Sequence, residues 1–279
     1  MKLSQRLGIG YTQTKFKLLS ALSKTKAAER AFILFNTPFL RSKRPGVPQN
    51  AEAISFKFKN LTINGFRWNY PQNNKVLILH GFGSAAYKFE AYAAPLVKKG
   101  YEVLAFDAPA HGNSEGKTVN AVEYAEMILE VIRLYGPIHK FLSHSFGGIA
   151  LSLALEQTVQ NPETKIVFIA PATETTSAID AGFRILKIND AAVKKGFHDI
   201  ILRISGKETA WFSIRRAIKN IKAEVLWIHD EDDDITPLSD ALKVKEDNHP
   251  NINFVITKGL GHRKIYHEQS IKNQVISFL

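Results

Sequence analysis

The sequence of 279 residues contains no cysteine. Without thiols the chain has no disulfide bonds and no thiolate metal sites, and it carries no mark of an oxidising compartment. Long apolar runs are also missing. The basic stretch 1–20 has no continuous hydrophobic region and no plausible cleavage site. We therefore expect neither a signal peptide nor a membrane span, and a cytoplasmic location.

Metal-binding patterns are scarce as well. No pair among the nine histidines has the spacing of a zinc site with a third ligand. The acidic run 230–234 lacks the spacing of a hard-cation loop, because consecutive side chains point in different directions. We therefore predict no metal and no cofactor.

Positive charge is concentrated at one end of the chain. The net charge is +11, and residues 1–45 contain ten basic side chains and one acidic one, which account for +9 of it. The remainder is close to neutral, so the basicity does not belong to the main body of the protein. No aromatic stacking pattern accompanies the basic segment, and we predict no nucleic-acid partner.

A basic amphipathic helix is predicted over 13–36, where apolar residues recur at helical spacing with Lys and Arg between them. Pro38, Pro45 and Pro48 keep it from continuing. Two interpretations are open. The commoner one is an accessory helix that packs on the protein with a solvated basic face. The other is a weak contact with an anionic membrane surface or an acidic partner.

An antiparallel hairpin is predicted next. Alternating apolar residues predict a strand from residue 54 to residue 63, with a break at Asn60 that a bulge would allow. Asn64-Gly65 is a strong signal for a two-residue turn, and the chain is expected to return over 66–70.

Strand and helix patterns alternate from residue 75 onward, which predicts an α/β fold with a doubly wound, mostly parallel sheet. The strands are expected at 76–79, 102–106, 141–142, 166–170, 225–228 and 252–256, and the helices at 85–98, 119–134, 146–160, 237–246 and 263–278.

The alternation lapses after Pro171, and about forty residues without a strand are too many for a plain connection. We predict a small helical lid there. The resulting division is a basic N-terminal helical extension at 1–48, a core at 49–171 and 212–279, and a lid insertion at 172–211.

One stretch suggests catalysis. Phe141 and Leu142 form an apolar run that stops at Ser143-His144-Ser145-Phe146-Gly147-Gly148, and a helical pattern then begins. A strand that turns directly into a helix holds the corner residue in a strained conformation and exposes its side chain beside the first helical N–H groups. Ser145 is the predicted nucleophile. Ser143 stands where the usual G-x-S-x-G pattern has glycine.

Other strand ends also carry chemically useful residues, and in a parallel sheet these ends lie at one edge. In chain order the five segments are H-G-F-G at 80–83, D-A-P-A-H-G-N-S at 107–114, S-H-S-F-G at 143–147, H-D-E-D-D-D-I-T-P at 229–237 and G-L-G-H at 259–262. With these five motifs in this order, residues 50–279 resemble the α/β-hydrolase family.

The resemblance implies the α/β-hydrolase fold and an oxyanion loop at H-G-F-G. It places the family's acid at Asp233 and its histidine at His262. Asp230 stands where the family has glycine, and five consecutive acids leave a neighbouring residue open as the acid. Most of the run can also be solvated loop charge.

The chemistry of these groups predicts a serine hydrolase. His262 can take the proton of Ser145 near neutral pH, and Asp233 would fix its tautomer. The backbone N–H groups of Phe82 and Phe146 are the candidate oxyanion donors. The expected partner is a small-molecule acyl substrate, an ester or thioester. A carbon–carbon-bond hydrolase, an acyltransferase, a peptidase, a cofactor-free peroxidase and a non-catalytic binding protein on the same scaffold remain open.

Overall fold

A computed structural model describes residues 13–14, 16–39, 41–43 and 46–279. The chain forms two compact units. The helical unit comprises Met1–Thr37 and Glu174–Phe212, and the sheet unit comprises Pro38–Thr173 and Ser213–Leu279. Parts of the predicted basic extension, residues 1–12, 15, 40 and 44–45, lie outside the described residues.

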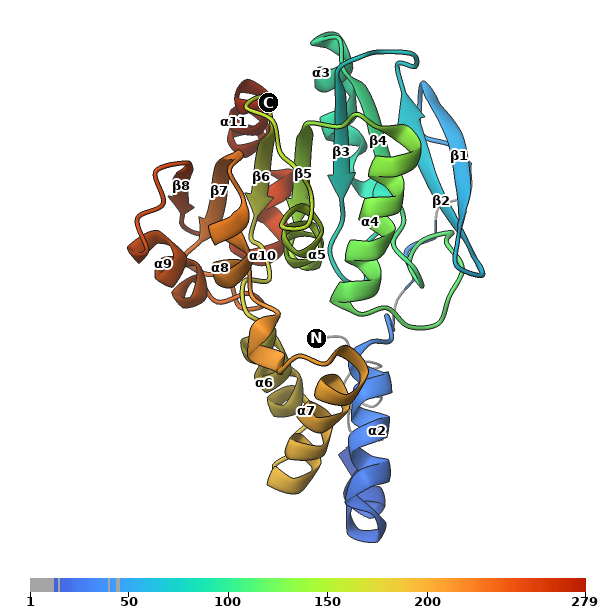
Figure 1. Cartoon of the computed structure of the whole chain (residues 1–279), viewed down its shortest axis with the longest axis vertical. Helices are drawn as coiled ribbons and strands as arrows, with labels where there is room; N and C mark the ends of the chain where they lie inside the picture. The colour runs from blue at the N-terminus through green and yellow to red at the C-terminus, as the bar shows by residue number, and fades with distance from the viewer. Residues whose placement is uncertain (1–12, 15, 40, 44–45) are drawn as a thin grey trace. The chain divides into compact units, whose positions relative to one another are not determined.

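The sheet unit is built on an eight-stranded sheet, as shown in Figure 1. The strand order is β1-β2-β4-β3-β5-β6-β7-β8, with antiparallel pairing of β1 to β2 and of β2 to β4 and parallel pairing for the rest. The strands are β1 (Ala51–Phe58), β2 (Leu61–Trp68), β3 (Lys75–Leu79), β4 (Glu102–Phe106), β5 (Lys140–His144), β6 (Lys165–Ile169), β7 (Glu224–Asp230) and β8 (Ile252–Thr257). The predicted mostly parallel α/β sheet with an N-terminal hairpin is confirmed.

The hairpin turn lies elsewhere than predicted. β1 pairs with β2 so that Phe58 faces Leu61, which makes Lys59 and Asn60 the turn, and Lys59 takes φ 52°. The prediction of a turn at Asn64-Gly65 was wrong, because position 65 lies within β2 and is a glycine for reasons of packing. A Cβ on Gly65 would lie 2.4 Å from Cδ1 of Phe106 on β4, so only glycine lets the strands meet there.

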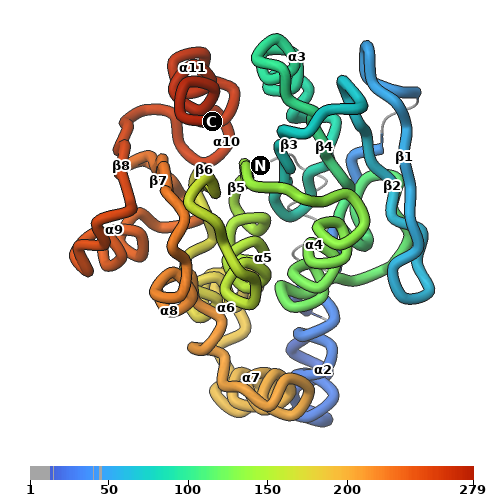
Figure 2. Tube along the Cα trace, turned by 45° about the horizontal axis from the view of Figure 1, so that its top comes forward, coloured from blue at the N-terminus to red at the C-terminus, as the bar shows by residue number. Residues whose placement is uncertain are grey.

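Helices cover both faces of the sheet, as Figure 2 shows. On one face lie α4 (Ala121–Tyr135) and α5 (Phe146–Leu155), and on the other α3 (Glu90–Lys98) and α11 (Gln269–Phe278). The sheet unit also contains η1 (Ala86–Phe89), α8 (Ile214–Ala217), η3 (Ile218–Asn220), α9 (Leu238–Glu246), α10 (Gly261–Lys264) and η4 (Ile265–His267). Residues from β3, β4 and β6 are almost fully apolar and buried, which is typical of strands covered on both faces.

The helical unit contains α2 (Lys24–Phe35), α6 (Thr175–Ile185), α7 (Ala191–Ser205) and η2 (Thr209–Trp211). Its core is aromatic. The ring of Phe197 is 1% exposed and lies 5.4 to 5.7 Å from those of Phe32, Phe35 and Phe183. Phe183 and Phe197 therefore form part of the core of the helical unit.

The N-terminal helix is interrupted. Residues 13–14 and 16–22 are helical, but the helix predicted over 13–36 breaks at Ser23, whose hydroxyl caps α2 by accepting from the amide of Lys26. Lys24 and Asp190, the N-cap residue of α7, form an ion pair between the two helices. The apolar residues Ala27, Ala28, Ala31 and Leu34 of α2 are buried. Both interpretations of the basic segment stay predictions.

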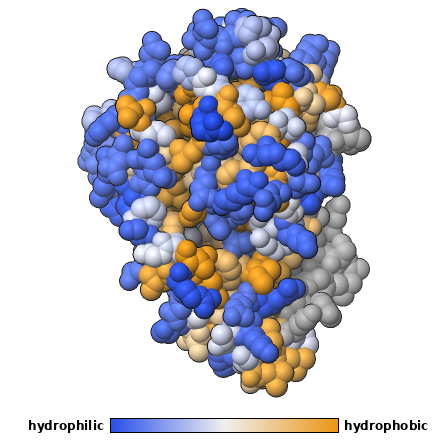
Figure 3. Space-filling model, turned by 45° about the vertical axis from the view of Figure 1, so that its right-hand side comes forward, coloured by the Kyte–Doolittle hydropathy of each residue, from blue (hydrophilic) through white to orange (hydrophobic). Residues whose placement is uncertain are grey.

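The surface has the usual mixture of residue types. On the face drawn in Figure 3, hydrophilic residues predominate and apolar residues occur between them. Within the described ranges, no helix combines the length and the apolar character that crossing a bilayer requires.

Candidate active site

Ser145 occupies the corner between β5 and α5. Its backbone adopts φ 55° and ψ −119°, a conformation that costs energy for any residue with a side chain. Three hydrogen bonds hold the corner in place: the amide of Ser145 donates to the carbonyl of Ile169, and its own carbonyl accepts from the amides of Gly148 and Ala172. The strained turn predicted from the sequence is therefore present, and Ser145 is its central residue.

Small residues around Ser145 let the helix approach the sheet. A Cβ on Gly147 would lie 2.8 Å from the carbonyl oxygens of Leu79 and His80, so this position requires glycine. Ser143, where the family pattern has glycine, fits in β5. Its side chain is buried, and its hydroxyl donates to the carbonyl of Val167 at 3.3 Å.

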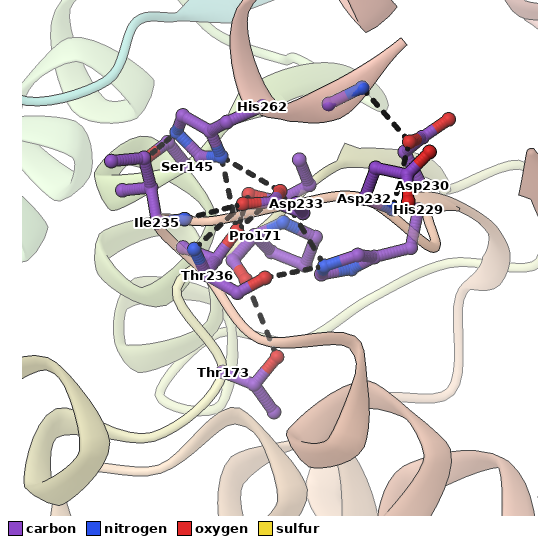
Figure 4. Close-up of polar contacts among 12 residues, drawn as sticks. Ser145, Pro171, Thr173, His229, Asp230, Asp232, Asp233, Ile235, Thr236 and His262 are labelled. Atoms are coloured by element: carbon purple, nitrogen blue, oxygen red, sulfur yellow. Dashed lines mark hydrogen bonds and ion pairs between the residues drawn. The ribbon is translucent and has the colours of Figure 1, made fainter. Parts of the chain in front are cut away.

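Three side chains that are far apart in sequence form one hydrogen-bonded chain (Figure 4). Oγ of Ser145 lies 3.0 Å from Nε2 of His262, and Nδ1 of His262 lies 2.8 Å from Oδ2 of Asp233. All three residues are at least nine-tenths buried. A carboxylate can only accept, so Nδ1 carries the ring proton and Nε2 is left to accept from the serine hydroxyl.

Local bonds orient Asp233. Its Oδ1 accepts from the amides of Ile235 and Thr236, and its Oδ2 accepts from the hydroxyl of Thr236 at 2.8 Å. Burial by itself would raise the pKa of Asp233. The bond to His262, the positive charge that His262 can carry and the two amides outweigh burial, so the pKa is lowered and the carboxylate stays ionised.

Two residues near Asp233 and His262 were not singled out from the sequence. Thr236 bridges the site, because its hydroxyl lies 2.8 Å from Asp233 and 3.1 Å from Nδ1 of His262. His229 donates from Nε2 to the carbonyl of Thr236 at 2.8 Å. The spacing of Thr236 three residues after an aspartate in a loop is a local capping signal that could have identified it.

His144, beside the nucleophile, is buried in the structure. Its Nε2 lies 3.1 Å from the carbonyl oxygen of His262, to which it donates, and its ring packs 4.5 Å from that of Tyr266. Burial and the neighbouring His262 lower the pKa of His144 to about 3, so this imidazole is neutral. It is therefore suited to packing and to holding His262, and not to carrying a proton.

The H-G-F-G loop after β3 lies against Ser145. A Cβ on Gly81 would lie 2.9 Å from Cβ of Ser145, which shows how closely the loop backbone approaches it. In the described part of the chain, the amides of Phe82 and Phe146 have no hydrogen-bond acceptor. Two unpaired N–H groups are thus available, one in this loop and one directly after Ser145.

His80 and His111 connect the loops after β3 and β4. Nε2 of His80 accepts from the amide of Ala108 at 3.0 Å, and Nε2 of His111 accepts from the amide of Gly83 at 2.8 Å. The ring acceptors thus connect the two loops, while each Nδ1–H donates to a carbonyl of its own loop. Burial lowers the pKa of His80 to about 4 and that of His111 to about 3, so both rings are neutral acceptors.

The acidic and imidazole side chains at the described positions do not form a metal site. Among the residues that the structure describes, no three His, Asp or Glu side chains gather closely enough to hold a metal ion. What the site offers is a hydroxyl, a base, a carboxylate and two free amides.

Comparison with known proteins agrees with this geometry. The model of the serine aminopeptidase S33 family matches residues 70–198. A putative esterase/lipase 2 of Mycoplasma pneumoniae is 26% identical over 116 residues, which are 39% of this chain and 42% of the relative. The uncharacterized hydrolase YugF of Bacillus subtilis is 30% identical over 132 residues, 42% of this chain and 45% of the relative. The chain thus spans less than half the length of these curated relatives.

Solved structures extend the similarity over most of the chain. The esterase Pf2001 of Pyrococcus furiosus has a TM-score of 0.65 at 20% identity, over 88% of this chain and 98% of the other. A predicted CIB-like hydrolase of Thermoplasma acidophilum has a TM-score of 0.59 at 15% identity, over 82% and 97%. At such identities the likeness concerns the fold. The sheet order and these structures show the α/β-hydrolase fold, and residues 70–198 are similar to the serine aminopeptidase S33 family.

Proposed function

We propose that the chain is a serine hydrolase that cleaves a carboxylic ester or thioester through an acyl-enzyme. Ser145 is the nucleophile, His262 the general base and acid, and Asp233 the residue that orients the base. The observation that carries the proposal is the continuous chain of hydrogen bonds, 3.0 Å from Ser145 to His262 and 2.8 Å from His262 to Asp233.

In the first step Oγ of Ser145 attacks the substrate carbonyl carbon while Nε2 of His262 takes the hydroxyl proton. The imidazolium that forms is stabilised by the ionised carboxylate of Asp233. The carbonyl π-electrons move onto oxygen and give a tetrahedral oxyanion. Phe82 and Phe146 offer backbone N–H groups for that oxyanion, and loss of one such donor typically costs about a hundredfold in rate or more.

Collapse of the tetrahedral intermediate breaks the bond to the alcohol or thiol, which leaves with the proton from His262. A water molecule then repeats the sequence on the acyl-enzyme. It gives a proton to Nε2 of His262, attacks the acyl carbon, and releases the carboxylic acid as Ser145 regains its proton. The proton of Ser145 leaves with the alcohol or thiol, a proton from water replaces it, and the enzyme ends the turnover in its starting protonation state.

The acyl group is proposed to be small and largely apolar. The rings of Phe82 and Phe146 lie 5.5 Å apart in an edge-to-face contact, and Phe82 is 40% exposed although it is a large apolar residue. Two aromatic rings beside the candidate oxyanion amides favour an apolar group over a charged one.

The matched family's description also favours a test for amide cleavage, because the same residues can attack an amide. Purified protein is assayed with p-nitrophenyl acetate and butyrate, with a matched thioester and with aminoacyl p-nitroanilides. We expect turnover of the ester or thioester, and Ser145→Ala to lower it about a thousandfold or more. Ser152→Ala, which removes a buried serine of the same helix, is the matched control.

A fluorophosphonate probe separates an enzyme from a binding protein on the same scaffold. Probe attachment that requires Ser145 supports the proposal even when no tested ester fits the site. Absence of both turnover and labelling in the wild-type protein would favour the binding protein. Preference for the anilide would keep the mechanism and change the substrate class.

A further inference from the structure

The acidic run after β7 contacts the backbone of the segment that carries His262. Oδ1 of Asp230 accepts from the amide of Gly261 at 2.8 Å, and its Oδ2 accepts from the amide of Leu260 at 3.1 Å. Oδ2 of Asp232 accepts from the amide of Gly259 at 2.9 Å. Three consecutive N–H groups directly before His262 are thus bound by two carboxylates.

The backbone of this segment has the shape that such binding requires. Gly259 has φ 86° and Gly261 has φ 58°, whereas Leu260 between them is right-handed, with φ −94° and ψ −34°. Alternation of left- and right-handed residues makes successive N–H groups converge on one anion. The glycines of G-L-G-H therefore allow the segment to wrap around the carboxylate of Asp230.

Asp230 is fully buried and charged. Burial by itself would raise its pKa, but the hydroxyl of Thr257 at 2.6 Å and the amides of Gly261, Asp232 and Leu260 outweigh burial, and the pKa is lowered. Hydrogen bonds to an ionised acceptor are stronger than neutral ones. The carboxylate is therefore a firm anchor for the segment.

The other side of His262 is held independently. Its carbonyl oxygen accepts from Nε2 of His144, which stands next to Ser145 in sequence. The backbone of His262 is thus fixed on its N-terminal side by Asp230 and at its carbonyl by the neighbour of the nucleophile. Asp233 fixes the imidazole itself.

We infer that Asp230 is a positioning residue for His262: its buried carboxylate sets the backbone of Leu260 and Gly261 and thereby the 3.0 Å approach of His262 to Ser145. The inference rests on the proposed function. It gives two residues of the acidic run 230–234 different roles. Asp233 orients the imidazole ring of His262, and Asp230 holds the backbone segment that carries His262. The side chain of Glu231 forms an exposed ion pair with Lys258, at 3.2 Å.

Asp230→Asn is the direct test. The amide oxygen can still accept from Gly261, but the NH2 group would then face the N–H of Leu260, so two donors oppose each other. We expect kcat and the rate of fluorophosphonate labelling to fall about tenfold to a hundredfold with little change in KM. Amide hydrogen exchange over 259–262 is expected to be faster than in the wild type.

Asp240→Asn is the matched control, because Asp240 is also a buried aspartate, 4% exposed, but is paired with Lys243 on α9. It should label at the wild-type rate. Should Asp230→Asn not fold, Asp232→Ala removes the exposed bond to Gly259 and should give a smaller loss of the same kind.

The outcomes distinguish the inference about Asp230 from the proposed hydrolase function. A wild-type protein that labels at Ser145, with a folded Asp230→Asn variant that labels as fast, would overturn the inference alone. Equal slowing in Asp230→Asn and Asp240→Asn would also overturn it. A wild-type protein that neither labels nor turns over esters would overturn the proposed function, while unchanged exchange over 259–262 in Asp230→Asn would overturn the anchoring itself.

Discussion

The imidazole of His111 accepts a hydrogen bond from the backbone amide of Gly83, at 2.8 Å. This bond joins the turn after β4 to the H-G-F-G loop after β3, and it lies one residue beyond Phe82, whose N–H is a candidate oxyanion donor. The ring can accept only because it is neutral, and burial together with the nearby His80 lowers the pKa of His111 to about 3.

Replacing His111 should therefore impair catalysis more than binding. His111→Ala leaves the amide of Gly83 without its acceptor and frees the loop that carries Phe82. We expect kcat for an ester substrate to fall about tenfold or more with a small change in KM. His111→Gln, whose side-chain oxygen can accept the same bond, should restore part of the activity. Equal kcat in wild type and His111→Ala would contradict this role.

Substitution of the triad acid should act through the tautomer of His262. In Asp233→Asn the side-chain oxygen is needed by the amides of Ile235 and Thr236, so the NH2 group faces Nδ1 of His262. Nδ1 then becomes the acceptor and Nε2 carries the proton, which prevents it from taking the proton of Ser145. We expect kcat to fall by about 10³ to 10⁴.

The matched control for that variant is Asp234→Asn, which changes the exposed neighbour in the same loop and should retain wild-type kcat. If kcat falls strongly in Asp234→Asn and is normal in Asp233→Asn, then Asp234 is the acid that orients His262.

Gly65 offers a test of packing that is independent of catalysis. Gly65→Ala places a methyl group 2.4 Å from Phe106 and 2.6 Å from the carbonyl of Ala105, so β2 and β4 must separate or the ring must move. We expect the free energy of unfolding to fall by about 1–3 kcal/mol in urea denaturation. Ser55→Ala, on the exposed side of the same hairpin, should change it little.

Stability should decrease in mild acid because several histidines are buried in the neutral form. The pKa of His80 is lowered from 6.5 to about 4, and those of His111 and His144 to about 3. Between these values and 6.5 the unfolded chain binds protons that the folded chain does not. Each histidine therefore removes about 1.4 kcal/mol of stability per pH unit over that window as the pH falls.

One buried group acts in the opposite direction. Burial raises the pKa of Asp107 from 3.8 to about 6, so the folded chain binds a proton there that the unfolded chain lacks between those values. The stability that Asp107 adds as the pH falls offsets the loss caused by about one of the three histidines. The free energy of unfolding therefore still decreases. We expect the midpoint of urea denaturation to be lower at pH 5 than at pH 7. In His111→Gln the midpoint should change less between these two pH values. A midpoint that is constant or higher at pH 5 would contradict the prediction.

Much of the architecture follows from local patterns. The strand predicted at 102–106 is β4 with the same ends. The alternation of strands and helices after residue 75 predicted that the sheet is mostly parallel. Ser145 was identifiable because a strand that runs straight into a glycine-rich helix leaves one conformation for the corner residue. These features depend on neighbours within a few positions, and such neighbours are visible in the sequence.

The sequence-based predictions were wrong where a residue with a local sequence signal makes a contact with a residue far away in the chain. Asn64-Gly65 has the composition of a turn, but the glycine is required by Phe106, some forty residues away. Asp230 looked like one of several loop charges, yet it binds amides of a segment thirty residues later. Neither partner can be found from spacing, because the contacts exist only once the strands are in register.

By itself, the sequence determined the alternation of strands and helices, the strained corner at Ser145 and the chemical types at the strand ends, because backbone geometry and hydrophobic periodicity are local properties. Only the tertiary structure decided that Ser145, His262 and Asp233 meet within 3.0 Å and that His111 and Asp230 hold the loops around them. The reason is that parallel pairing of β3, β5, β7 and β8 brings their ends to one edge of the sheet, and that pairing is a property of the whole core.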